Sequence, residues 1–286
     1  MKKVDIIHYR KYIVSLTVIS LLFAFLVLLI VPFNKSIEFS GGFVFEVYGE
    51  VDKQKISEII GKSFETYKTN NGFIVKIPYI ENETFDSVQQ KIASLYQIGS
   101  ASMIAPSMTS SLVNKSLLAT TFAVATVFVY LFLRFNLYYS FGSILTILHD
   151  IILSIAFIKI MHIELSITTI AALLTIIGYS VNDTVIIYDK IRSHFTFKSN
   201  LKDIINASIN ETLPRTIGTS LTTIISIIPI AIFTQGQIHD FTIIVVFGIL
   251  IGTISSIAVS ALSLLPFEKQ IRNILELKHK INKSIT

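Results

Sequence analysis

The sequence predicts an α-helical membrane protein in which a small α+β domain separates the first of six membrane-spanning helices from the other five. The 286-residue chain is 52% hydrophobic and only 15% charged, whereas a soluble domain carries about a quarter charged residues. Its mean hydropathy is +0.67. A bilayer-spanning helix needs roughly 20 mostly apolar residues. Six segments meet this requirement: residues 12–32, 114–134, 138–161, 165–188, 215–234 and 241–265.

The first apolar segment follows a basic N-terminus and so has the outline of a secretion signal. However, this segment is about 20 residues long, which is longer than the apolar core of a signal peptide. No small-x-small cleavage site follows it. We therefore expect residues 1–32 to form a cytoplasmic N-terminus and a retained membrane anchor.

Residues 33–111 differ in kind from the apolar segments and predict a separate ferredoxin-like domain. The order of elements is β-α-β-β-α-β. Asn70-Asn71-Gly72 is typical of the hairpin turn between the two central strands. The sequence of this region holds no catalytic constellation, which favours a binding or docking module. The strand and helix patterns cover residues 43–47, 51–60, 64–68, 73–77, 84–95 and 99–104.

Residues 112–266 hold the other five spans, with a short amphipathic helix expected at about 200–213. Pro214 is expected to end that helix before the next span begins. A helix lying in the membrane interface fits the pattern, and a plain cytoplasmic loop helix is the alternative. The apolar residues of this segment share one face: Leu201, Ile204, Ile205 and Ile209.

Basic residues in the short loops predict the orientation, because cytoplasmic loops are enriched in Lys and Arg. The N-terminus holds four, residues 189–215 hold five and the tail 267–286 holds five, whereas the 234–240 loop holds none. We therefore expect both termini in the cytoplasm and the 33–111 domain outside. The basic tail fits contact with anionic membrane lipids, so the net charge of +5 does not indicate a nucleic-acid partner.

The absence of cysteine excludes disulfides, thiolate nucleophiles and cysteine-ligated metal sites. The six histidines lack the spacing of a metal site. We therefore expect neither a metal nor a cofactor.

Asp183 is the strongest functional candidate, because it lies inside the apolar segment 165–188. Charged side chains are costly in a membrane and usually face a bundle interior or a transport pathway. Helical geometry places it in a polar seam with Thr175, Tyr179 and Asn182, and Thr184 follows it. A second seam in the next span contains Arg215, Thr219 and Thr222.

The two seams are expected to face each other away from lipid, which would pair Asp183 with Arg215. Movement of the guanidinium would then change whether the acid holds a proton, giving a proton switch. The alternative is a static buried ion pair that only fixes helix register.

His149 and Asp150 lie near the middle of the third span. His149 could relay protons or could be a core histidine bonded to a carbonyl, and the depth of Asp150 favours a functional role. An intramembrane aspartyl protease would need glycines in the Gly-x-Gly-Asp pattern, which the stretch before Asp183 lacks. In the sixth span, small residues at four-residue spacing predict close helix packing: Gly248, Gly252 and Ser256.

Several motifs along the chain resemble those of the SecF family. Members of this family are the smaller membrane subunits of the SecD–SecF complex in bacterial Sec protein export. They belong to the resistance-nodulation-division superfamily. The likeness covers nearly the whole chain. Glu38 stands where the family usually has aspartate, and Ala105 where it usually has glycine. The motifs that carry the resemblance are Glu38-Phe39-Ser40-Gly41-Gly42, Leu133-Arg134-Phe135, His149-Asp150, the specific string Gly178-Tyr179-Ser180-Val181-Asn182-Asp183-Thr184, and Ser208 to Thr216.

The resemblance implies a non-enzymatic, proton-coupled accessory subunit in the bacterial cytoplasmic membrane. It implies work with SecD beside the SecYEG channel on exported preproteins, with Asp183 and Arg215 as the proton-linked residues. A proton-driven small-molecule or lipid exporter of the wider superfamily is the main alternative, although such exporters usually have twelve spans in one chain. A passive assembly scaffold is a third interpretation.

Overall fold

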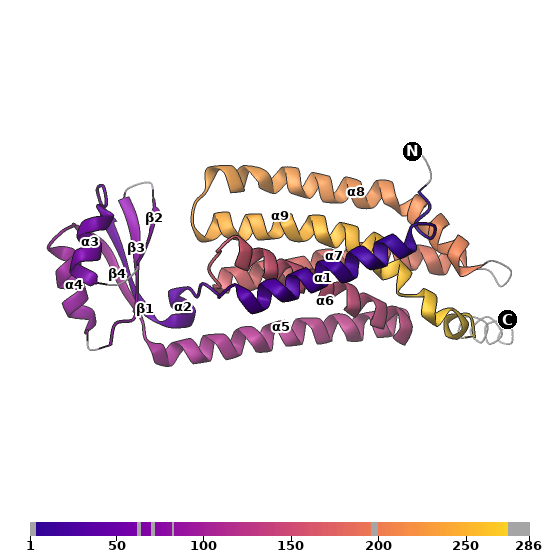
Figure 1. Ribbon diagram of the computed structural model, residues 1–286, viewed down its shortest axis with the longest axis horizontal. Helices are drawn as coiled ribbons and strands as arrows, with labels where there is room; N and C mark the ends of the chain where they lie inside the picture. The colour runs from indigo at the N-terminus through magenta and orange to yellow at the C-terminus, as the bar shows by residue number, and fades with distance from the viewer. Residues whose placement is uncertain (1–3, 62–63, 70–71, 82, 196–199, 274–286) are drawn as a thin grey trace.

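The computed structural model describes residues 4–273 apart from 62–63, 70–71, 82 and 196–199. It confirms the predicted fold class, with long apolar helices side by side and a small sheet domain at one end of them (Figure 1). A π-helical turn over Ser256–Ser260 and a 3-10 turn over Leu265–Phe267 extend the last helix. The six helices long and apolar enough to cross a membrane are α1 (Arg10–Ile30), α5 (Pro106–Arg134), α6 (Leu137–Ile160), α7 (Ile167–His194), α8 (Leu201–Phe233) and α9 (Gln237–Ser255).

The sheet domain has the predicted ferredoxin-like topology, with antiparallel strands in the order β2-β3-β1-β4. Alternating strand residues and the apolar faces of α3 and α4 form its core, which includes Phe43, Phe45, Ile56 and Ile92. The predicted turn residues Asn70 and Asn71 lie outside the described residues. The elements are β1 (Gly42–Tyr48), α3 (Lys53–Ile60), β2 (Glu65–Lys68), β3 (Gly72–Pro78), α4 (Phe85–Ala93) and β4 (Ile98–Ile104).

Two connections join this domain to the helices. On one side, the short helix α2 (Ile37–Ser40) ends at Gly41, whose φ of +76° favours glycine. A Cβ on Gly42 would lie 2.4 Å from the carbonyl oxygen of Ile77, so only glycine fits where the chain enters β1. On the other side, Ala105 alone separates β4 from α5. The second connection is therefore almost direct.

Helix α8 differs from the sequence prediction. We expected Pro214 to separate an interfacial helix from the fifth span, but one helix runs from Leu201 to Phe233 through both Pro214 and Pro229. The expected break is therefore wrong. The predicted apolar face of residues 201–209 packs into a core at the end of the bundle far from the sheet domain, which includes Ile187 and Ile191 of α7. This packing stabilises the first turns of α8, so the helix continues past Pro214 despite the hydrogen bond lost there.

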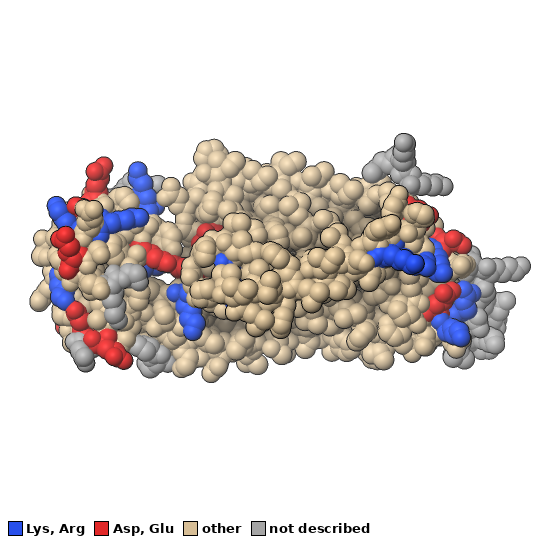
Figure 2. All heavy atoms as spheres, in the orientation of Figure 1, with Lys and Arg blue, Asp and Glu red and all other residues tan. Residues whose placement is uncertain are grey.

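The outer surface shows why the chain is a multi-pass membrane protein. Charged side chains gather at the two ends of the molecule, and the face between them is almost free of charge (Figure 2). Large apolar side chains are exposed along this middle region, for example Leu22, Leu117 and Phe233. Such a continuous apolar surface is unfavourable in water and suits lipid.

Candidate functional site

Asp183 is completely buried on α7 and is 0% exposed. Neither of its carboxylate oxygens has a hydrogen-bond partner among the described residues. Thr184 beside it is also buried. A buried polar group without a partner is costly, so this acid is not explained by stabilisation of the fold.

Arg215 does not form the expected ion pair with Asp183. Its side chain is exposed, and no salt bridge joins the two residues in the described part of the chain. The two nevertheless interact electrostatically. At 1.5 Å per residue, Asp183 lies about 24 Å and Arg215 about 27 Å from the ends of α7 and α8 that face the sheet domain. Asp183 and Arg215 therefore lie at similar depth along the bundle, as predicted, but they do not form an ion pair.

Asp150 lies at the centre of a buried polar network between three helices. The Nδ1 atom of His149 is 3.0 Å from one carboxylate oxygen of Asp150. The other oxygen accepts hydrogen bonds from Ser180 of α7 at 2.7 Å and from Ser255 of α9 at 2.9 Å. His149 therefore contacts the acid, and the two serines complete a site that the sequence interpretation did not name. Ser180 lies one helical turn before Asp183, which was the available signal for it.

Replacing Ser180 with alanine is expected to destabilise the helical bundle. The change removes the 2.7 Å bond to the buried Asp150, and removing a hydrogen-bond partner of a buried polar group costs up to about 1–3 kcal/mol. Thermal unfolding in detergent measures the effect. Ser193→Ala on the same helix is the matched control, because Ser193 is exposed and bonds only the backbone of Lys190. Equal unfolding temperatures for the two variants would contradict this prediction.

The predicted polar seams do not face each other. Asn182 is exposed, and so are Thr219 and Thr222 of α8, whose hydroxyls donate to carbonyl oxygens of their own helix. The expectation that both seams turn inward is therefore wrong for this single chain. Threonine hydroxyls satisfied within their own helix need no neighbouring helix, so the spacing of polar residues could not fix the direction of the seam.

Tyr179 is the seam residue that does connect the helices. Its hydroxyl donates to Ser220 of α8 at 3.4 Å, and Ser220 lies 2.6 Å from the hydroxyl of Thr253 on α9. The sequence interpretation did not single out Ser220 or Thr253. Together they form a second line of polar groups across α7, α8 and α9.

The predicted small-residue positions lie where α9 packs against its neighbours. A Cβ on Gly248 would be 2.2 Å from the side chain of Ile176. A Cβ on Gly252 would make ordinary van der Waals contact with Ser180 at 3.4 Å and with Asp150 at 3.6 Å, and Ser256 is fully buried in the π-helical turn. These residues let α9 approach α7 closely beside the Asp150 network.

Replacing Gly248 with valine is expected to lower stability by about 1–3 kcal/mol, because extra atoms overfill a packed core. The clash is with Ile176, so Ile176→Ala should recover part of the loss. Gly178→Val on the exposed face of α7 is the control, since a Cβ there meets nothing within 4 Å. A similar loss in both glycine variants, measured by thermal unfolding, would contradict the packing explanation.

A buried ion pair joins the sheet domain to the membrane helices. Lys76 of β3 lies 3.0 Å from Glu164 in the loop between α6 and α7, and their side chains are only 9% and 7% exposed. Tyr67 of β2 donates to Glu164 at 2.7 Å. Burial, and then the nearby Glu65 carboxylate, raise the pKa of Tyr67 above its ordinary range, so its phenol remains a donor. No local pattern in the sequence predicted this junction.

Glu38, one of the motif residues, strengthens the same junction from α2. One of its carboxylate oxygens accepts from the backbone nitrogen of Ile167 at 2.8 Å, at the start of α7. The other accepts from Gln237 at 3.1 Å, at the start of α9. Glu38 therefore links the sheet-domain end of the chain to two membrane helices.

Within the described residues, no group of three or more His, Cys, Asp or Glu side chains could hold a metal ion. The fold and the site define a class: a multi-pass membrane protein with buried acids among its spans and a small domain at one end of the bundle. This arrangement suits a subunit of transport machinery better than a catalytic centre.

Comparison with known proteins identifies the family. The model described as "Protein export membrane protein SecD/SecF, C-terminal" matches residues 84–270. The chain is 33% identical to protein translocase subunit SecF of Rickettsia rickettsii over 90% of this chain and 89% of that protein. It is 34% identical to the SecF of Rickettsia prowazekii, again over 90% of this chain.

Solved structures agree with the sequence relatives. The crystal structure of SecDF, a translocon-associated membrane protein from Thermus thermophilus, matches 93% of this chain with a TM-score of 0.82 and 27% identity. SecDF in a super-membrane-facing form gives a TM-score of 0.70. The chain spans only 39% and 40% of those two longer chains.

The chain therefore belongs to the SecD/SecF family of protein-export membrane proteins. This membership gives it an accessory role in Sec protein export and association with SecD. The family consists of translocase subunits and is not known for catalysis.

Proposed function

We propose that this chain couples proton movement across the membrane to a late step of preprotein translocation, together with SecD and beside the SecYEG channel. The observation that carries the proposal is Asp183, a fully buried acid whose carboxylate oxygens have no hydrogen-bond partner in the described structure. Intramembrane acids of this kind mark ion pathways. An acid without an ion pair or a hydrogen bond among the described residues is free to bind and release a proton.

The exposed polar face of α7 and α8 is the proposed contact with SecD. Asn182 and Arg215 are exposed here at a depth where lipid tails would offer no hydrogen bonds. A partner helix that covers this face would satisfy them and enclose Asp183. The proton site would then be completed only in the complex.

The proposed orientation places both termini in the cytoplasm and the sheet domain outside the bacterial cytoplasmic membrane. In this orientation the domain meets preproteins as they leave the channel, and lipids cover the exposed apolar belt. The basic residues near the described ends of the chain support it, for example Arg10 and Lys269. Lys2, Lys3, Lys198, Lys278, Lys280 and Lys283 lie outside the described residues.

Proteoliposomes that contain this chain, SecD, SecYEG and the export ATPase test the proposal. We expect a proton gradient to raise the yield of fully translocated preprotein, and a protonophore to remove that gain. A sodium gradient at constant pH distinguishes the coupling ion. Stimulation that persists without any gradient would overturn proton coupling and favour a scaffold.

A further inference from the structure

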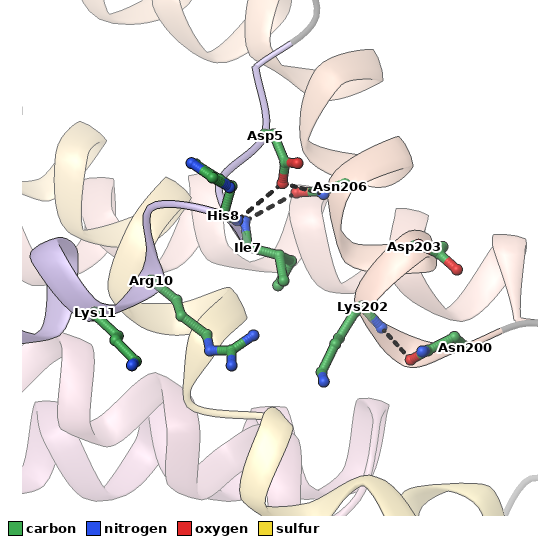
Figure 3. A pocket seen from close by; sticks show the side chains of 9 residues that line it. All are labelled: Asp5, Ile7, His8, Arg10, Lys11, Asn200, Lys202, Asp203 and Asn206. Atoms are coloured by element: carbon green, nitrogen blue, oxygen red, sulfur yellow. Dashed lines mark hydrogen bonds between the residues drawn. The ribbon is translucent and has the colours of Figure 1, made fainter.

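A polar pocket of about 410 Å³ lies at the end of the helical bundle opposite the sheet domain. It is formed by the segment that leads into α1 and by the first turns of α8, which lie next to each other there (Figure 3). Neither the buried acids nor the junction with the sheet domain takes part in it. The pocket is therefore separate from the proposed proton site.

Unpaired cations dominate the pocket. Arg10 from α1 and Lys202 from α8 extend toward the space between these helices, and Lys11 lines its edge (Figure 3). None of the three forms an ion pair within the described residues. Within the described part of the chain, these cations therefore have charge available for a ligand.

Neither acid of the pocket forms an ion pair with these cations in the described structure. Asp5 accepts from the backbone nitrogen of His8 at 2.9 Å and from the amide of Asn206 at 2.7 Å. These donors lower the pKa of Asp5, the backbone bond most strongly. Asp203 turns away from Arg10 (Figure 3). The side of the pocket that faces Arg10 and Lys202 is therefore positive.

Hydrogen bonds hold the two walls of the pocket together. Asn206 accepts from the backbone nitrogen of Ile7 at 3.2 Å, and Asn210 accepts from that of Val4 at 2.7 Å. Ile7 is also buried in the core at this end of the bundle. The segment before α1 is thus fixed on α8, and the pocket exists before any ligand arrives.

The pocket lies at the level where a membrane surface meets the chain. Tyr9 and Tyr12, on either side of the two basic residues of α1, are 53% and 75% exposed. Tyrosines of this kind are enriched at the headgroup level of membranes. The exposed apolar surface of α1 begins at Val14. A ligand in the pocket would therefore be at the depth of phospholipid headgroups.

We propose that this pocket binds the phosphate group of an anionic phospholipid, with Arg10 and Lys202 as the main contacts and Lys11 at the rim. A guanidinium and an ammonium from two helices suit a phosphate held between them. The lipid would link the start of α1 to the start of α8 through its headgroup.

Native mass spectrometry of the full chain with phosphatidylglycerol or phosphatidylcholine tests the proposal. We expect phosphatidylglycerol to bind more tightly. Each basic residue near an anionic headgroup contributes about 1 kcal/mol. The affinity should therefore fall about fivefold for Lys202→Gln and about thirtyfold for Arg10→Gln with Lys202→Gln. Lys269→Gln is the matched control, because Lys269 is exposed near the same end without an ion pair in the described region.

Several results would overturn the proposal. Equal binding of the two lipids, or an equal loss with Lys269→Gln, would reduce the pocket to ordinary basic surface. Displacement of phosphatidylglycerol by millimolar inorganic phosphate, lost in the Lys202→Gln variant, would assign the site to soluble phosphate. Unfolding temperatures confirm that each variant is folded, and these binding results do not depend on proton coupling.

Discussion

With Asp183 replaced by asparagine, we expect gradient-dependent stimulation of export to fall to the level measured without the chain. Asparagine keeps the shape of the side chain but cannot carry a proton or a charge. Because the acid is 0% exposed and its oxygens have no hydrogen-bond partner among the described residues, its removal costs only its electrostatic interaction with Arg215 and Asn182. The unfolding temperature should therefore stay the same or rise.

Asp189→Asn is the matched control, since it is the same substitution two turns later on α7. Asp189 is partly exposed and forms an ion pair with Arg134 at 3.0 Å, an interaction worth about 0–1 kcal/mol at a surface. We expect it to leave export and its gradient response unchanged. Full stimulation in the Asp183→Asn variant would exclude the proton role. A lower unfolding temperature with an unchanged gradient response would instead indicate a structural acid.

The second large effect is expected at the junction between the sheet domain and the helices. Glu164→Gln removes the ion-pair partner of the buried Lys76, which keeps only the weaker interactions with the charges of Glu65, Glu38 and Asp240. Breaking a buried ion pair costs up to about 3–5 kcal/mol. We expect the junction to open while the domain itself stays folded, because the core of the domain does not include either residue.

Spin labels can measure this opening, because the chain has no native cysteine and labels attach only where cysteine is introduced. With labels at Glu58→Cys and Met161→Cys, both exposed positions, Glu164→Gln should broaden the distance distribution. Lys76→Met combined with Glu164→Leu should restore a narrow one, since an apolar pair of similar size can replace a buried ion pair.

Glu83→Gln is the control for the junction, because it removes a more exposed ion pair with Lys91 inside the sheet domain. We expect no change in the distance distribution for this variant. A narrow distribution in Glu164→Gln, equal to that of the parent, would show that the pair does not hold the domain in place.

The sequence was sufficient for the spans and the sheet domain because these depend on local patterns. The length of an apolar segment predicts a membrane-spanning helix, and alternation of apolar and polar residues between turn residues predicts a strand. The continuous path of α8 through Pro214 was not predictable in this way, because packing of residues 201–209 against α7 outweighs the local effect of proline. Contacts between distant parts of the chain therefore determine the length of α8.

The polar contacts were less predictable than the helices. Depth marked Asp150 and Asp183, but nothing local showed that Ser180 and Ser255 would bond one acid and leave the other without a partner. Lys76 and Glu164 lie 88 positions apart in the chain and looked like ordinary loop and strand residues. Such pairs become visible only when the fold brings distant segments together.

The near-direct connection between β4 and α5 has a mechanical consequence. With Ala105 as the single residue between them, a tilt of α5 is passed to the sheet domain with little slack once the contacts of Lys76 and Glu38 with the other helices are released. At 1.5 Å per residue the 29-residue α5 is about 43 Å long, so a tilt of about 10° about its far end swings the sheet domain by about 7.5 Å. Small helix movements within the bilayer would thus become large strokes outside it.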